Sequence, residues 1–475
     1  MLRLLFRRNW PFKFPEALAL SYGIGIAAVS IQMAIMPLCG MRFSVFSLMI
    51  WWVPLIAVTL LIGFKNPLSL RGLRAKRSRT KQSKKEIASS FDKSSGRSPE
   101  QSRGASLTKR FARNDNAPLT LIERFFVLGI SFEVLYAFFR TLIKPMESYD
   151  SIAIYALKSK IFYLDKMIPL NFFKSFANFV PHIEYPLLIP LAETQFYTFL
   201  GSLNDLLVKI IFPLYYAALL TIAYSVSGRF LNRKAALFFT FLLATIPQVT
   251  DFATNGYADI PFAFYCSVSF FYLYLWLKQN ENPHLALSFI FSIFAVWTKP
   301  EGLLFALIYA AVIITCMAKE RRLRLIGVTY AVMSLCVVIT YVLGWRAIGL
   351  AVNSDFTGTQ VSLASKIITG FRRIPAILYE YQIQFFGPKK WNMIWMLFIA
   401  GFILGFKKIF SKEIFPVTLA ILLVFSGYSI VYMLSSAPQG FGWHLSTSGS
   451  RLFLHFVPMV VLWLALIFKE LKLEI

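Results

Sequence analysis

The sequence of 475 residues lacks the short motifs on which soluble nucleotide-driven enzymes depend. It contains no P-loop, no dinucleotide-binding glycine pattern, no GxSxG and no HExxH segment, so nothing in it supports a cytosolic nucleotide-driven mechanism. Cysteine is also scarce, and the few cysteines stand inside apolar runs with neither disulfide nor metal spacing. We expect them to be small core residues. They are Cys39, Cys266, Cys316 and Cys336.

Acidic residues are few, 23 against 49 Lys and Arg, and the formal net charge is +26. A large share of the positive charge lies in residues 65–113, mixed with Ser, Gln and Gly. This composition predicts a flexible polybasic cytoplasmic linker, residues 65–119, rather than a folded domain. Because the rest of the chain is strongly apolar, we expect this linker to contact anionic lipid headgroups, and we expect no nucleic-acid partner.

Apolar residues make up 57% of the chain, and the mean hydropathy is +0.61. Recurring apolar runs predict an all-α polytopic membrane protein with about twelve transmembrane helices. The predicted spans are 17–39, 45–64, 120–142, 206–227, 235–249, 260–277, 284–297, 302–318, 325–345, 391–406, 414–434 and 453–468. The first run is long enough to span and has no convincing cleavage site, so we expect no cleavable signal peptide. The expected divisions are a transmembrane pair in residues 1–64, the linker, and the main transmembrane domain in residues 120–475.

Basic residues favour one topology. Clusters before the first span and after the second, fourth, eighth, tenth and last spans all fall on one side, which the positive-inside rule makes the cytoplasm, with both termini there. The outer loops, residues 143–205, 346–390 and 435–452, are long and rich in aromatic residues, which predicts interfacial helices. Five basic residues break the rule because the same topology leaves them outside. They are Lys366, Arg372, Arg373, Lys389 and Lys390.

Three groups of charged residues then lie near the outer face. The first joins Glu147 and Asp150 to Lys158 and Lys160, after the span at residues 120–142. A carboxylate at such a boundary can act as a general base, whereas the plain alternative is a solvated loop with a surface ion pair.

The second group is DFATNGYAD, between Asp251 and Asp259. Asp259 stands just before the predicted span 260–277, where a carboxylate stabilises the helix N-terminus whether or not anything binds; we expect Asp251 to be ordinary loop. The third group is WTKPEG, in which Lys299 and Glu301 interrupt an otherwise apolar stretch. A Pro and Gly turn explains the break without function, but a lysine placed there suits a phosphate oxygen.

Near the C-terminus, Arg451 and His444 belong to the same face. Arg451 is suited to bidentate phosphate binding, and snorkelling to headgroups is its alternative role. Because no zinc-ligand spacing is present, we expect His444 and His455 to be structural.

Five segments, in this order, resemble bacterial GT-C membrane glycosyltransferases, over roughly residues 120–470. The relatives are the family-39-like enzymes, which include protein O-mannosyltransferases and the transferases that add aminoarabinose to lipid A. The segments are YDSIAIYALKSKIFYLD at 149–165, HIEYPLLIPL at 182–191, GYADIPFAFY at 256–265, VWTKPEGLL at 296–304 and SGSRLFLHFVP at 448–458.

The resemblance implies a GT-C-like catalytic domain in residues 120–475 and assigns roles within it. Asp150 matches the acid that serves as general base in the first outer loop, and Glu147 resembles a second catalytic acid, although two residues separate them here. Asp259 resembles the second-loop acid that contributes to an acidic or metal-binding pocket in some relatives.

Three basic residues look like contacts to the donor phosphate: Lys160, Lys299 and Arg451. The pocket implied by the resemblance also contains Glu301, His444 and Tyr149. Tyr149 stands where many relatives have Trp.

The implied reaction is an inverting transfer of a sugar from a polyprenyl-phosphate donor to a hydroxyl of a lipid, glycan or protein. Asp150 would take the hydroxyl proton, while the basic residues stabilise the departing phosphate. No cofactor is required; a divalent metal held by Asp150 and Asp259 is compatible with the family. The implied location is the bacterial inner (plasma) membrane, with the site facing the periplasm, in lipopolysaccharide or cell-envelope glycan biosynthesis.

Two other classes of protein remain open. A secondary transporter or flippase of lipid-linked sugars predicts ionisable residues near mid-span and an internal repeat. Glu133 is the main mid-span acid, and no repeat is visible. A non-enzymatic membrane scaffold would explain the basic linker but not the outer-face acids.

Overall fold

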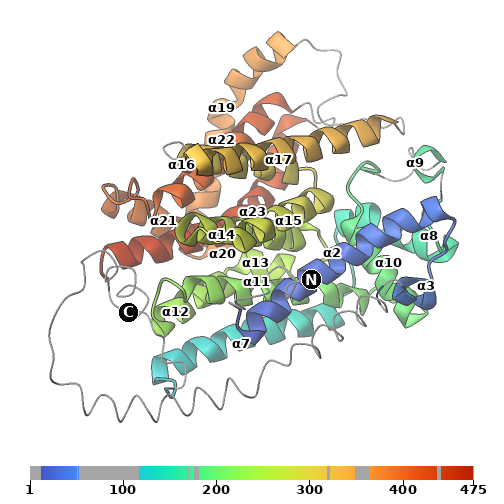
Figure 1. The fold of residues 1–475 in the computed structure, drawn as a ribbon, viewed down its shortest axis with the longest axis horizontal. Helices are drawn as coiled ribbons and strands as arrows, with labels where there is room; N and C mark the ends of the chain where they lie inside the picture. The colour runs from blue at the N-terminus through green and yellow to red at the C-terminus, as the bar shows by residue number, and fades with distance from the viewer. Residues whose placement is uncertain are drawn as a thin grey trace.

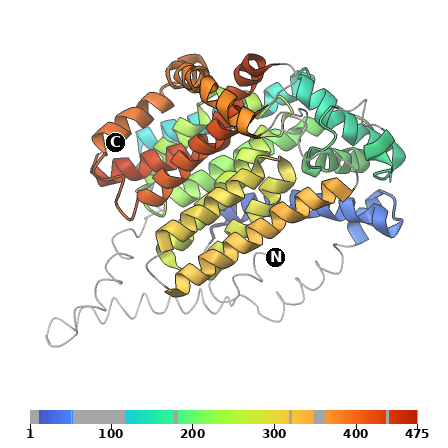
Figure 2. The same cartoon turned by 90° about the horizontal axis from the view of Figure 1, so that it is seen from above.

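The computed structural model describes residues 12–50, 52, 117–169, 171–175, 181–317, 321–347, 363–435 and 440–473. These residues form helices joined by short connections, and no strand occurs among them, which confirms the predicted all-α class. The linker falls outside the described residues except for 117–119, and so does most of the second predicted span. Figures 1 and 2 show that most of the long helices run roughly parallel to one another.

In chain order the helices are α2 Phe14–Ile35, η1 Met36–Cys39, α3 Val45–Ile50, α7 Leu121–Ile143, η2 Asp150–Ala156, α8 Leu157–Asp165, α9 Phe172–Ser175, α10 Leu188–Leu200, η3 Val208–Ile210, α11 Ile211–Ser227, α12 Arg233–Ala244, α13 Pro247–Phe252, α14 Asp259–Gln279, α15 Asn282–Thr298, α16 Gly302–Met317, α17 Arg321–Ala347, α19 Leu363–Phe386, α20 Pro388–Trp391, α21 Ile394–Leu404, α22 Phe415–Leu434 and α23 Phe441–Glu470.

Within the described residues, six helical segments have the length and apolar composition to cross a membrane. They are Phe14–Cys39, Leu121–Ile143, Val208–Ser227, Asp259–Gln279, Phe415–Leu434 and Phe441–Glu470. Shorter apolar helices accompany them at Asn282–Thr298, Gly302–Met317, Leu325–Val337 and Ile394–Leu404. The chain is therefore a multi-pass membrane protein, but the predicted total of twelve spans is not confirmed.

Two of the predicted spans differ from the helices in the structure. The span predicted at 235–249 is divided, because α12 ends at Ala244 and α13 begins at Pro247. Proline has no amide hydrogen and cannot donate the backbone hydrogen bond that would continue a helix. It is well suited to the first turn of a new helix, where that bond is not needed. The span predicted at 391–406 is the 11-residue helix α21, which is too short to cross a bilayer core about 30 Å thick.

The predicted outer loop 346–390 contains a 24-residue helix, α19, which packs against α22 and α23. Its side chains Ile377 and Tyr381 are buried, whereas Leu378 and Tyr379 are exposed. The Tyr381 ring lies 5.2 Å from the ring of Phe453 on α23. This part of the loop therefore belongs to the helix bundle. Its charged residues interrupt the apolar run from which a span is predicted.

The short helices α8, α9 and α10 and the π-helical segment η2 do lie in the predicted outer loop 143–205. In Figure 1 the labelled helices α8, α9 and α10 gather with α3 at one end of the long helices. The expected position of α8, α9 and α10 along a bilayer surface stays a prediction.

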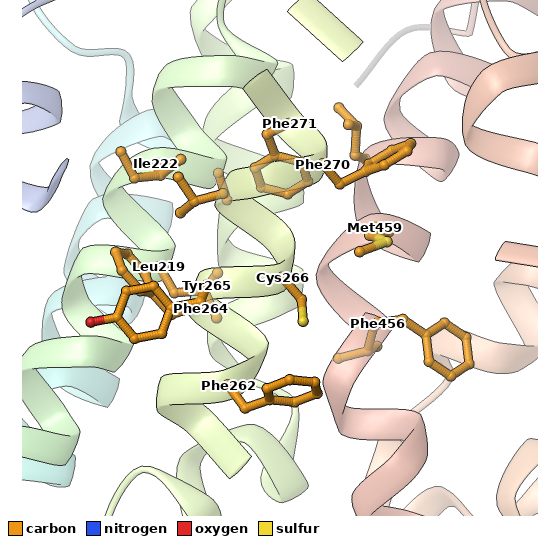
Figure 3. Packing of buried hydrophobic residues seen from close by; sticks show 14 of the residues in the cluster. Leu219, Ile222, Phe262, Phe264, Tyr265, Cys266, Phe270, Phe271, Phe456 and Met459 are labelled. Carbon is orange, nitrogen blue, oxygen red and sulfur yellow. The ribbon is translucent and has the colours of Figure 1, made fainter. Parts of the chain in front are cut away.

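The core of the bundle is built around α14. This helix is apolar on all sides, as expected of a fully enclosed helix, and 94% of its most hydrophobic window is buried. Figure 3 shows side chains of α14, such as Cys266, between Leu219 of α11 and Met459 of α23. By contrast, only 17% of the corresponding window of α7 is buried, so most of the apolar surface of α7 is exposed.

Ion pairs connect helix termini at the end of the bundle remote from η2. Glu16 near the start of α2 accepts hydrogen bonds from Arg229 and Tyr272, each at 2.6 Å. Glu123, which also caps α7 through Thr120, lies 2.8 Å from Arg233 at the start of α12. These contacts fix which helix ends lie together, and they place the starts of η2 and α14 at the opposite end.

Candidate functional site

A guanidinium group between two carboxylates is the centre of the candidate site. Arg451 on α23 donates through Nη1 to Asp150 Oδ2 at 2.6 Å. Its Nη2 and Nε atoms donate to Asp259 Oδ2 and Oδ1 at 3.2 and 3.3 Å. Asp150 is 301 positions from Arg451 in the sequence and Asp259 is 192. Three segments that are remote in sequence therefore supply one charged cluster.

Lys299 extends this cluster into the protein. Its ammonium group donates to Asp259 Oδ1 at 3.0 Å and lies 3.1 Å from Glu301 Oε1. The side chains of Lys299 and Asp259 are 3% and 0% exposed, so neither charge is solvated. Buried charges are tolerated when they are paired and hydrogen-bonded, and each of these two has at least two charged neighbours.

His455 completes the surroundings of Asp259. Its Nε2 lies 2.9 Å from Asp259 Oδ1, and its Nδ1 lies 2.8 Å from the Tyr428 hydroxyl. A neutral ring that donates from Nε2 and accepts at Nδ1 satisfies both contacts. His455 follows Arg451 by one helical turn, so both side chains lie on the same face of α23. The sequence predicted a structural role for His455, but its contact with Asp259 could not be foreseen from local spacing.

The turns of the chain explain why these side chains meet. Asp259 is the first residue of α14, where the helix dipole favours a negative charge. Just before it, Gly256 has φ +84°, and a Cβ there would lie 3.0 Å from the Cβ of Ser151 in η2. A Cβ on Gly302 would lie 2.5 Å from backbone atoms of Ala295 and Val296. Gly256 therefore allows the turn before Asp259 to pack closely against η2. Gly302 allows the turn after Lys299 to pack closely against the end of α15.

Aromatic side chains adjoin the charged cluster. The Arg451 guanidinium lies 4.7 Å from the centre of the Tyr257 ring, a cation–π contact. Tyr155 in η2 is fully buried, and its hydroxyl has no hydrogen-bond partner in the described part of the chain. Burial, followed by the charge of Asp259, raises the pKa of Tyr155 well above its usual value. The sequence analysis missed both tyrosines because nothing in their local sequence distinguishes them from core aromatics.

Glu301 has one oxygen on Lys299, while its Oε2 is enclosed without a hydrogen-bond partner among the described residues. Burial is the largest single influence and raises the pKa of Glu301, but the Lys299 charge, His455 and a backbone hydrogen bond together outweigh it, so the net pKa is lowered.

Three predicted site residues are paired with groups outside the charged cluster, and a fourth, Tyr149, is largely exposed. Glu147 is half-exposed and lies 2.9 Å from Lys144. Tyr149 is 67% exposed. The prediction that Glu147 takes part in catalysis is thus not supported by its position, because an exposed pair with the adjacent lysine leaves it outside the cluster.

Lys160, predicted to hold the donor phosphate, instead lies 2.7 Å from Asp205, which also accepts from Tyr197 at 2.9 Å. His444, predicted in the pocket, has its Nδ1 2.9 Å from Ser435 Oγ. In both cases the side chain bonds to a partner that is not one of the predicted site residues.

Lys158, expected in the first outer-face group, is completely buried. Its ammonium donates to the carbonyls of His182 and Ile183 at 2.7 and 3.2 Å. Burial lowers its pKa to about 7, against a smaller opposing effect of Glu184. Asp251, expected in ordinary loop, lies in the last turn of α13 and forms a 2.6 Å ion pair with Arg140 of α7.

Burial decides which charged residues of the cluster are accessible to a ligand. Asp150 and Arg451 are each 19% exposed in their side chains, whereas Lys299 and Asp259 are enclosed. Lys299 therefore does not fit the predicted direct contact with a phosphate, and its position instead stabilises Asp259. The accessible pair is Asp150 with Arg451.

A divalent metal held by Asp150 and Asp259 was also compatible with the sequence. In the structure the guanidinium of Arg451 lies between these carboxylates, and a second cation there would be repelled. Among the described residues, no group of three or more His, Cys, Asp or Glu side chains is arranged to hold a metal. In the structure Arg451, rather than a metal ion, bridges the two carboxylates, and a shared metal stays a prediction.

Comparisons with family models, with curated proteins and with solved structures found no match to this chain. The resemblance to GT-C glycosyltransferases thus stays a prediction that depends on the short segments quoted above.

Proposed function

We propose that this multi-pass membrane protein is a glycosyltransferase that moves a sugar from a polyprenyl-phosphate donor to an acceptor hydroxyl. The reaction would take place at the extracytoplasmic face of a bacterial inner membrane and would invert the anomeric carbon. The observation that supports it best is the Asp150–Arg451 pair, partly exposed and anchored on the enclosed Asp259 and Lys299.

The pairing of Arg451 suggests how donor and base are used together. Asp259 accepts hydrogen bonds from Nη2 and Nε of Arg451, whereas Nη1 is hydrogen-bonded to Asp150. A new anion can therefore replace Asp150 at Nη1 without breaking the two bonds to Asp259. A donor phosphate that takes Nη1 would release Asp150 to accept a proton. Binding of the anionic substrate would thereby produce the free general base.

In the proposed reaction the acceptor oxygen forms a bond to the anomeric carbon as its proton passes to Asp150. The bond between that carbon and the phosphate oxygen breaks, and its electron pair leaves with the polyprenyl phosphate. Arg451 stabilises the phosphate charge as it develops, because its guanidinium is already held in place by Asp259. His455 and Lys299 keep Asp259 oriented and anionic.

The experiment compares the products made by the wild type and by Asp150→Asn. Loss of a general base lowers the rate by about 10²–10⁴-fold, so mass spectrometry of envelope glycans and lipids is expected to show the transferred sugar only with the wild type. The matched control is Asp165→Asn, the same change at an exposed position at the end of α8. Equal sugar transfer by wild type and Asp150→Asn would contradict the base assignment.

A transporter or flippase of lipid-linked sugars is the second candidate. The hydrogen-bonded series Tyr428–His455–Asp259 is buried within candidate spans, and such series also occur in proton pathways of transporters. This alternative predicts counterflow of labelled lipid-linked sugar that survives Asp150→Asn, without any new covalent product.

A further inference from the structure

A polar cavity of about 410 Å³ lies between α7, α13 and α20, apart from the residues used in the proposed reaction. Asn392, just after α20, donates to the carbonyl of Thr245 at 2.7 Å and so fixes α20 beside the start of α13. The lining residues are Glu133, Tyr136, Arg140, Thr245, Pro247, Gln248, Thr250, Asp251, Lys389 and Lys390.

The charges of this cavity favour an anion near its α20 side. Asp251 is compensated by Arg140 at 2.6 Å. Lys389 and Lys390 are exposed, and neither forms an ion pair within 4.0 Å in the part of the chain that the structure describes. Glu380 of α19 interacts electrostatically with Lys390 at longer range. Lys389 and Lys390 are also two of the five basic residues that the positive-inside rule leaves on the outer side. In that predicted topology, whose twelve spans the structure does not confirm, a site that needs positive charge would account for these two exceptions.

The position of the cavity points to a lipid as the source of the anion. It lies alongside α7, whose apolar residues Leu128, Phe132 and Leu135 are each exposed by about two-thirds. Arg140 and Glu133, both lining residues, are seven positions apart on α7, so the cavity extends about 10 Å along this helix. A ligand here would have its polar part in the cavity and its chains against the exposed face of α7.

We propose that this cavity binds the phosphate-bearing headgroup of a membrane lipid. The phosphate lies against Lys389, Lys390 and Arg140. Glu133, which accepts a hydrogen bond from Thr250 at 3.3 Å, faces the hydroxyl or amine end of the same headgroup. The proposal does not depend on the transferase reaction, because it uses none of the residues of the Asp150–Arg451 cluster.

The test uses the full-length protein in nanodiscs of phosphatidylcholine with a minor fraction of phosphatidylglycerol. A photoreactive p-benzoylphenylalanine replaces Tyr136, which lines the cavity, or Leu128, which is exposed about three helical turns from Arg140 and is not a lining residue. Irradiation attaches nearby lipids, and mass spectrometry identifies them. We expect phosphatidylglycerol to be strongly enriched at position 136 and to match the bilayer composition at position 128.

Charge removal then tests the lysines. Each basic residue near a membrane surface contributes about a five-fold preference for anionic lipid, so Lys389→Gln with Lys390→Gln is expected to reduce the enrichment by roughly 30-fold. The matched control is Lys407→Gln with Lys408→Gln, a second adjacent pair at the other end of α21. This control is expected to leave the enrichment at position 136 unchanged.

Three results would overturn the proposal. The first is adducts at position 136 that follow the bulk composition. The second is an equal loss of enrichment in both lysine pairs, which would indicate a general surface charge effect. The third is complete displacement of the lipid by millimolar inorganic phosphate, which would indicate a site for a small free anion.

Discussion

Asp259→Asn is the substitution that tests the charged cluster most directly. The carboxylate is fully buried and has contacts with Arg451, Lys299 and His455 between 2.9 and 3.3 Å. Asparagine has almost the same shape but no charge. After the change Arg451 would retain Asp150, and Lys299 would retain Glu301, yet the enclosed Lys299 and the partly exposed Arg451 would share less negative charge.

Breaking a buried ion pair by neutralising one partner costs about 3–5 kcal/mol. With an unfolding entropy of about 2 cal/mol/K per residue over this chain length, the unfolding midpoint is expected to fall by about 3–5 °C. The measurement is a thermal unfolding scan of purified protein in detergent. The matched control is Asp205→Asn, because Asp205 is 40% exposed in its pair with Lys160 and such pairs contribute about 0–1 kcal/mol.

A double variant separates charge from packing. Lys299→Met alone leaves Asp259 with one cation fewer, and combined with Asp259→Asn it removes one charge of each sign. Directly paired residues are coupled by about 0.5–3 kcal/mol, so the double variant is expected to lose less stability than the sum of the two single losses. A midpoint for Asp259→Asn no lower than that of Asp205→Asn, together with additive single effects, would refute a cluster held by charge pairing.

Two further predictions concern the backbone and the buried lysine. Gly302→Ala adds a Cβ 2.5 Å from backbone atoms and is expected to lower stability by about 1–3 kcal/mol; Gly442→Ala, whose Cβ would meet nothing within 4 Å, is expected to change little in the same thermal scan. The pKa of Lys158 is lowered to about 7 in the folded protein, whereas its usual value is near 10.4. Between these two pH values Lys158 binds fewer protons in the folded than in the unfolded state, so its contribution to stability rises with pH in that window. Thermal scans are expected to show a gain of up to about 2 kcal/mol from pH 7.5 to pH 9 that Lys158→Met removes, and an unchanged pH profile in this variant would contradict the assignment.

Local sequence was informative about Asp150, Asp259, Lys299, Glu301 and Arg451. Each interrupts or borders an apolar run, where a charge is costly unless it is used or paired. The structure brings all five into one connected cluster. The same reasoning placed Lys160 and Glu147 with them, because proximity in sequence to Asp150 does not distinguish a side chain directed into the cluster from one directed at Asp205 or Lys144.

Helix packing also decided matters that hydropathy could not. The charged residues of α19 interrupt its apolar run, so the helix resembles a loop in the sequence, although its buried face packs on α22 and α23. His455 was expected to be structural because no ligand spacing surrounds it. Its partner, Asp259, lies 196 positions away.

The sequence by itself determined that this is an all-α membrane protein, because apolar composition and run length are local properties that a bilayer selects directly. It also determined which charged residues stand at the ends of apolar runs. Only the tertiary structure decided that Arg451 lies between Asp150 and Asp259, that Lys299 is enclosed, and that Lys389 and Lys390 border a cavity beside α7. Those contacts join residues of separate helices, and they depend on how the helices pack rather than on any single segment.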